Sequence, residues 1–243
     1  MKNIAVLICL TLSSISGNLF GQTDQEFRIA LVTLVELDFK SEIENYLVPT
    51  IAIYQSGWVL YRGIHENNSS YYSVKLNMMS MQTLVSSLEI NEELKSMADD
   101  FNATPLSGQP QSTLVLNFKE KTIKSVHGAI RNDTTVQKVV PPAFMHTFTK
   151  LIDYATTEST NWMPEKFEVI ITERIELSES PTLWPTEWPS NFRENHFFGE
   201  SILLPREDFE TFSKLFASTK SGGIEFDGKV YDLAYRFPFP KID

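Results

Sequence analysis

Apolar runs rich in β-branched and aromatic residues alternate along the chain with segments whose apolar positions recur every three to four residues. The first kind predicts strands, and the second predicts amphipathic helices. Three pairs of runs have the spacing of β-hairpins: residues 50–54 with 58–62, residues 113–118 with 122–126, and residues 224–226 with 229–231. Gly57 supplies the positive φ that a short hairpin loop needs, and Asp227-Gly228 is typical of a type I′ turn. Further strands are expected at 27–36, 71–76, 167–175 and 197–204, and for residues 27–36 a helix is the alternative because Leu31, Leu34 and Val35 would share one face.

Three segments carry the apolar stripe of a helix that packs through one face. Ser80 is expected to cap the first helix, and prolines begin the other two, at Pro141-Pro142 and at Pro205. The stripes consist of Met81, Leu84, Val85 and Leu88; of Phe144, Phe148, Leu151, Ile152 and Ala155; and of Phe209, Phe212 and Phe216.

A short sequence motif recurs at an interval of 64 residues. Met145–Leu151 is echoed by residues 210–215 and, more faintly, by residues 83–86, and the turns at 55–57 and 119–121 share the interval. Internal duplication of a strand–helix unit would explain this, and so would the reuse of common residues at strand-to-helix connections. In either case the stripe within Met145–Leu151 indicates core packing.

The first 21 residues have the pattern of a secretory signal peptide. A short basic start precedes an apolar run at 4–12 and a small, polar segment that ends at Gly21. The only cysteine, Cys9, lies inside the apolar run, too early for a lipid anchor, so residues 22–243 contain no thiol and no disulfide. We expect an exported protein, periplasmic or extracellular, whose residues 22–243 form one domain or two similar subdomains without a transmembrane segment.

Composition excludes some classes of partner. The formal net charge of −10 repels phosphate backbones, so nucleic acid is not an expected ligand. A hydrophobic fraction of 42% with 17 phenylalanines predicts a packed, aromatic core.

Catalytic and cofactor motifs are absent from the sequence. It has no G-x-S-x-G, Walker, G-x-G-x-x-G or H-E-x-x-H pattern, and the four histidines (His65, His127, His146 and His196) lack metal-ligand spacing. We therefore expect no cofactor and no metal. Carboxylates cluster at Asp24–Glu26, at Asp99-Asp100 and at Glu173, Glu176 and Glu179, where a solvated acidic surface is the favoured interpretation.

An aromatic loop is the one candidate ligand-binding segment. Two Trp-Pro pairs, at Trp184 and Trp188, are followed by Phe192 and force an extended chain. Their rings could contact a sugar or a proline-rich peptide, or they could anchor a long loop by burial, which we favour.

The early hairpin with Tyr54 and Gly57, the Trp-Pro segment at Trp184-Pro185 or Trp188-Pro189, and the closing segment Tyr235–Pro240 together resemble a family of uncharacterised exported bacterial proteins. Phe237 separates Arg236 from Pro238, which departs from the Arg-Pro tail of that family. The resemblance implies export and fold class, and it implies no activity.

The sequence thus predicts an α+β protein in which antiparallel hairpins pack with about three helices. The leading hypothesis for its function is an exported, non-enzymatic binding or structural module whose partner is a protein or a polysaccharide. The alternative is an exported hydrolase that uses paired carboxylates on a glycan.

Overall fold

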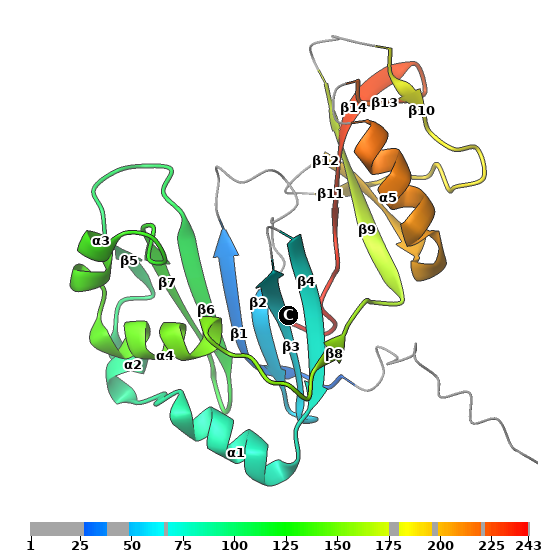
Figure 1. Cartoon of the computed structure of the whole chain (residues 1–243). Coiled ribbons are helices and arrows are strands. Elements are labelled where there is room, and N and C mark those ends of the chain that lie inside the picture. Colours follow the sequence, from blue (N-terminus) through cyan, green and yellow to red (C-terminus); the bar gives the residue numbers. More distant parts are fainter. Residues whose placement is uncertain are drawn as a thin grey trace, which may run out of the picture.

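The computed structural model describes residues 27–37, 49–65, 68–174, 180–195, 199–219 and 222–242. The segment expected to be a signal peptide, residues 1–21, lies outside the described residues. The expected α+β class is confirmed, but the architecture is richer than predicted. The described residues form two sheets and five α-helices, where one sheet and about three helices were expected (Figure 1).

The larger sheet has eight strands in the order β5-β7-β6-β1-β2-β3-β4-β8. All neighbours are antiparallel except β5 and β7. The strands are β1 (Ala30–Leu37), β2 (Pro49–Tyr54), β3 (Trp58–His65), β4 (Asn68–Lys75), β5 (Asp100–Asn102), β6 (Gln111–Asn117), β7 (Lys121–His127) and β8 (Thr160–Asn161). The strand expected at 27–36 is confirmed from Ala30 onward, and β1 is hydrogen-bonded on both sides, by β2 and β6.

The β2–β3 turn depends on Gly57. Its φ of +85° is one that L side chains rarely adopt, and a Cβ there would lie 2.6 Å from the carbonyl oxygen of Leu76. This close approach lets the Gly57 carbonyl accept a hydrogen bond from the Leu76 amide, which fixes the end of β4 beside the turn.

Four helices gather beside the larger sheet: α1 (Met78–Ser87), α2 (Glu92–Ser96), α3 (Thr134–Val139) and α4 (Pro142–Ile152) (Figure 1). The predicted N-cap of α1 is wrong by three residues. Asn77 is the cap, and its side chain accepts from the amide of Ser80. The predicted stripe of α4 is confirmed for Phe144, Phe148 and Leu151, which are buried in the core between helices and sheet.

The smaller sheet has six strands in the order β10-β13-β14-β9-β12-β11. They are β9 (Lys166–Glu173), β10 (Thr182–Leu183), β11 (Arg193–Asn195), β12 (Gly199–Pro205), β13 (Ile224–Phe226) and β14 (Lys229–Arg236). A 3-10 turn, η3 (Arg206–Asp208), leads into α5 (Phe209–Ser218), which packs on this sheet (Figure 1). Phe212 of α5 is fully buried against Phe167 of β9.

An aromatic cluster beyond β14 joins the C-terminal segment to the larger sheet. Phe239 packs edge-on against Tyr71 of β4 and against Trp162, and Phe237 also contacts Tyr71. Phe237 contacts Phe209 of α5 as well, so one ring connects the cores of the two sheets.

The two 64-residue-spaced hairpins, β2–β3 and β6–β7, lie in the same sheet on either side of β1. The helix of the third echo, α5, belongs to the other sheet. That the recurrence reflects duplication stays a prediction.

Candidate functional site

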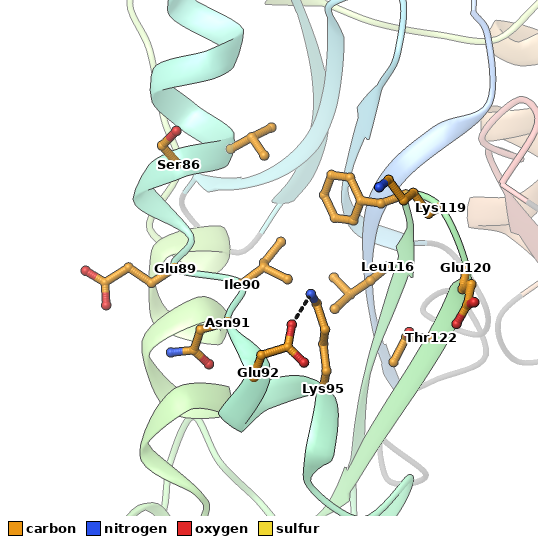
Figure 2. Close-up of a pocket in the computed structure, with 12 residues that line it drawn as sticks. Ser86, Glu89, Ile90, Asn91, Glu92, Lys95, Leu116, Lys119, Glu120 and Thr122 are labelled. Atoms are coloured by element: carbon orange, nitrogen blue, oxygen red, sulfur yellow. Dashed lines mark hydrogen bonds and ion pairs between the residues drawn. The ribbon is translucent and has the colours of Figure 1, made fainter.

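An open cleft of about 1050 Å³ lies between the end of α1, the start of α2 and the tip of the β6–β7 hairpin (Figure 2). Twelve residues line it: Val85, Ser86, Glu89, Ile90, Asn91, Glu92, Lys95, Leu116, Phe118, Lys119, Glu120 and Thr122. Its volume lies just above the range of about 300–1,000 Å³ that is typical of ligand pockets.

The helical wall of the cleft is shaped by the connection between α1 and α2. Glu89 has a φ of +49°, so the chain leaves α1 through a left-handed turn. Asn91 then caps α2 by accepting a hydrogen bond from the amide of Leu94. These two turns place Ile90 in the cleft, facing Leu116 of β6 (Figure 2).

Helix α4 holds this wall from behind. The Thr147 hydroxyl lies 2.8 Å from the carbonyl oxygen of Leu88, the residue that caps the C-terminus of α1, and it is completely buried. The neighbouring His146 ring lies 3.1 Å from the Ser87 carbonyl. The stretch that recurs in the sequence thus positions the cleft wall through its polar residues.

The floor of the cleft is apolar. Val85, Ile90, Leu116 and Phe118 supply it, and Leu116 is 2% exposed whereas Phe118, beside the hairpin turn, is 42% exposed. An aromatic side chain that stays this open at the edge of a concave, apolar surface can provide contact area to a ligand at little conformational cost.

Charged groups of both signs form the rim. Lys95 and Glu92 pair at 2.7 Å, as the dashed line in Figure 2 marks. Glu89 points away from Ile90 and Leu116 (Figure 2), toward His146 at 3.7 Å. The Lys119-Glu120 turn lies on the opposite side.

His146 is not arranged as a general base toward this cleft. Its Nε2 atom faces both the Ser87 carbonyl and the Glu89 carboxylate, and both partners accept hydrogen bonds. The nitrogen nearest the cleft wall therefore carries a proton and donates.

The carboxylate clusters of the sequence are dispersed as ion pairs over the fold. Asp99 binds Lys124, and Asp100 lies beside His127. Glu173 pairs with Lys229 at 3.0 Å in the smaller sheet. Residues 24–26, 176 and 179 lie outside the described residues, and so does His196. The structure brings none of the described members of these clusters into the cleft, and a carboxylate-dependent hydrolase stays a prediction.

The aromatic loop is packed against the smaller sheet. Trp184 and Trp188 are 7% and 6% exposed and contact each other edge-on, while Trp188 also packs on Phe212. Phe192 is half-buried between Trp184 and Phe226. This burial is what the anchoring interpretation expects. The ring faces would have to become exposed before a ligand could stack on them. Ligand binding by Trp184, Trp188 and Phe192 stays a prediction.

Sequence reasoning missed the cleft. The available signal was Phe118, an aromatic residue at the start of the polar turn Lys119-Glu120-Lys121. Its significance depends on Val85 and Ile90, which reach the same place only through the packing of α1 and α2 on the sheet.

Within the described residues no group of three or more histidine, cysteine, aspartate or glutamate side chains is placed to hold a metal ion. In the same part of the chain, no helix has the length and apolar character that crossing a membrane requires.

Comparison of the chain with protein-family models, with curated proteins and with solved structures found no match. The resemblance to exported bacterial proteins therefore rests on the residue pattern alone.

Proposed function

We propose that the protein is an exported, non-enzymatic binding module, and that the cleft between α1, α2 and the β6–β7 hairpin receives a polypeptide segment of a partner. The observation that carries this proposal is the apolar floor of an open cleft, made by Val85, Ile90, Leu116 and Phe118. Concave sites that bury an apolar or aromatic anchor dominate the binding energy of protein–peptide contacts.

The shape of the cleft favours a side chain presented by a flexible segment. A volume near 1050 Å³ exceeds one side chain, so the flanking residues of the segment would lie along the rim. Thr122 of β7 and Ser86 of α1 offer hydroxyl groups there that can bond to main-chain amides.

Charge supports a partner that is basic beside its apolar anchor. Around the cleft the carboxylates of Glu92 and Glu120 balance the ammonium groups of Lys95 and Lys119, while Glu89 points away toward His146. The attraction for basic segments therefore comes from the whole chain, which carries a formal charge of −10. The Lys95–Glu92 pair is exposed and therefore free to exchange partners at small cost.

Export is the part of the proposal that the N-terminal sequence supports. The basic start, the apolar run at 4–12 and the small residues up to Gly21 are the features that a secretion machinery recognises. Expression of the full chain with a protease-accessibility assay in a bacterial host tests it. We expect the mature protein outside the cytoplasm, and retention of the full-length chain inside would contradict export.

The binding proposal is tested by selection of a displayed library of random 12-residue peptides on the folded protein. We expect enriched peptides that place leucine, isoleucine, methionine or phenylalanine beside lysine or arginine. Added to the methyl-labelled protein, an enriched peptide should shift the NMR signals of Val85, Ile90 and Leu116. Failure to enrich any peptide, or shifts confined to other parts of the fold, would contradict the proposal.

A further inference from the structure

A second hollow of about 640 Å³ lies at the other end of α4, over strands β3 and β4, and shares no residue with the cleft. Three tyrosines form its aromatic part: Tyr61 of β3, Tyr72 of β4 and Tyr154, which follows α4. The loop from Asp153 to Ser159 closes its side.

The aromatic rings are held in fixed positions. Tyr61 and Tyr72 pair directly across β3 and β4, and their rings stack with centroids 5.5 Å apart. Tyr154 meets Tyr61 edge-on at 5.2 Å, and the Tyr61 hydroxyl donates to Ser159 at 2.8 Å. Rings that are already packed lose little conformational freedom when a ligand stacks on them.

Gly63 makes room for this arrangement. A Cβ at Gly63 would lie 2.7 Å from an edge carbon of the Tyr72 ring, so only glycine lets that ring lie over the β3 backbone. The result is an aromatic surface where β3 would otherwise carry an outward side chain.

Polar groups surround the rings. The hollow is lined by Asp153, Tyr154, Thr157 and Arg131, all of which have polar side chains. The Arg131 guanidinium binds both oxygens of Glu36, at 2.7 and 2.6 Å, so its plane is fixed. Arg62 and Arg131 also line an adjoining hollow of about 160 Å³, to which Glu36 contributes. The two hollows together form a longer site that could hold a ligand of more than one repeating unit.

The charges of the two adjoining hollows cancel. The two arginines, Arg62 and Arg131, are matched in number by Asp153 and Glu36, so the site has no net charge to attract an ion. A ligand that suits it is neutral, has an apolar face for stacking and carries many hydroxyl groups for the Asp153 carboxylate and the Arg131 guanidinium. A sugar ring has all three properties. We propose that the hollow of Tyr61, Tyr72 and Tyr154, with Asp153 and Arg131, binds a neutral saccharide chain.

The test titrates the ¹⁵N-labelled protein with maltotetraose, cellotetraose and tetra-N-acetylchitotetraose, and with tetragalacturonate as the anionic comparison. We expect at least one neutral tetrasaccharide to shift the amide signals of Gly63 and Tyr154. We expect Tyr154→Ala to raise its Kd by about tenfold, because a stacking ring is lost. Asp153→Ala, at an exposed position where folding is not at risk, should also weaken binding.

Phe118→Ala in the cleft is the matched control and should leave saccharide binding unchanged. The saccharide proposal and the peptide proposal can therefore be refuted separately. The proposal is overturned if no neutral tetrasaccharide shifts these signals. Equal binding by Tyr154→Ala and Asp153→Ala, or a preference for tetragalacturonate, would overturn it as well.

Discussion

Thr147 connects the central helix α4 to the wall of the cleft, and replacing it with valine tests that connection. Thr147→Val keeps the shape of the side chain but removes the hydroxyl that lies 2.8 Å from the Leu88 carbonyl. The same hydroxyl lies 3.1 Å from the Ala143 carbonyl within α4, where the backbone of α4 already provides a donor. The carbonyl of Leu88, the buried residue that follows α1, is the group that loses its partner.

The expected cost follows from burial. Both Thr147 and Leu88 have no exposed surface, so water cannot replace the lost hydrogen bond. Leaving a buried acceptor without a partner costs about 1–3 kcal/mol. For a chain of this size, each kcal/mol lowers the thermal midpoint by roughly 2–4 °C.

Urea denaturation followed by circular dichroism measures the change in the free energy of unfolding. Thr149→Val is the matched control, because Thr149 lies on the exposed face of the same helix. We expect the control to stay within about 0.5 kcal/mol of the wild type. If Thr147→Val unfolds at the same urea concentration as the control, the Thr147–Leu88 bond does not hold the wall.

Three further predictions concern other parts of the fold. Phe212→Ala should lower the free energy of unfolding by roughly 3–5 kcal/mol because this ring is fully buried, and a loss below about 1 kcal/mol in urea denaturation would contradict the packing of α5. Burial, followed by the charges of neighbouring groups, raises the pKa of Tyr154 from 10.0 to about 12. The folded state therefore keeps this phenol neutral, and its stabilising effect is present below pH 10 and lost as the pH rises through 12. The 295 nm absorbance of wild type minus Tyr154→Phe should show a midpoint near 12, and a midpoint near 10 would refute the burial. Gly57→Ala should lower the thermal midpoint more than Gly108→Ala, since both have positive φ but only Gly57 lies against the Leu76 carbonyl; equal shifts would contradict this.

Local features of the fold were predictable because short-range chemistry determines them. Gly57 and Asp227-Gly228 have positive φ where the hairpin turns require it, and the apolar stripe of α4 is buried as its spacing predicts. The cap of α1 was misplaced because Asn77 and Ser80 are both good capping residues, and only the hydrogen bond to the Ser80 amide decides between them.

Long-range features were not predictable from one sequence. The order of strands in two sheets depends on pairings such as β1 with β6, which are separated by about 80 residues along the chain. The cleft has the same origin, because Ile90 and Leu116 meet only after α1 and α2 have packed on the sheet. In contrast, the two Trp-Pro pairs at Trp184 and Trp188 are a local pattern, which indicates large rings on an extended chain but does not determine how exposed those rings are.

The most direct test of the central claim compares two exposed apolar residues of the same hairpin. Phe118 lines the cleft and is 42% exposed, whereas Ile123 on β7 is 44% exposed and lies outside the cleft. Calorimetry with a library-selected peptide should give a Kd raised about tenfold or more by Phe118→Ala and unchanged by Ile123→Ala. Equal Kd values for the wild type and both variants would show that the cleft is not where the partner binds.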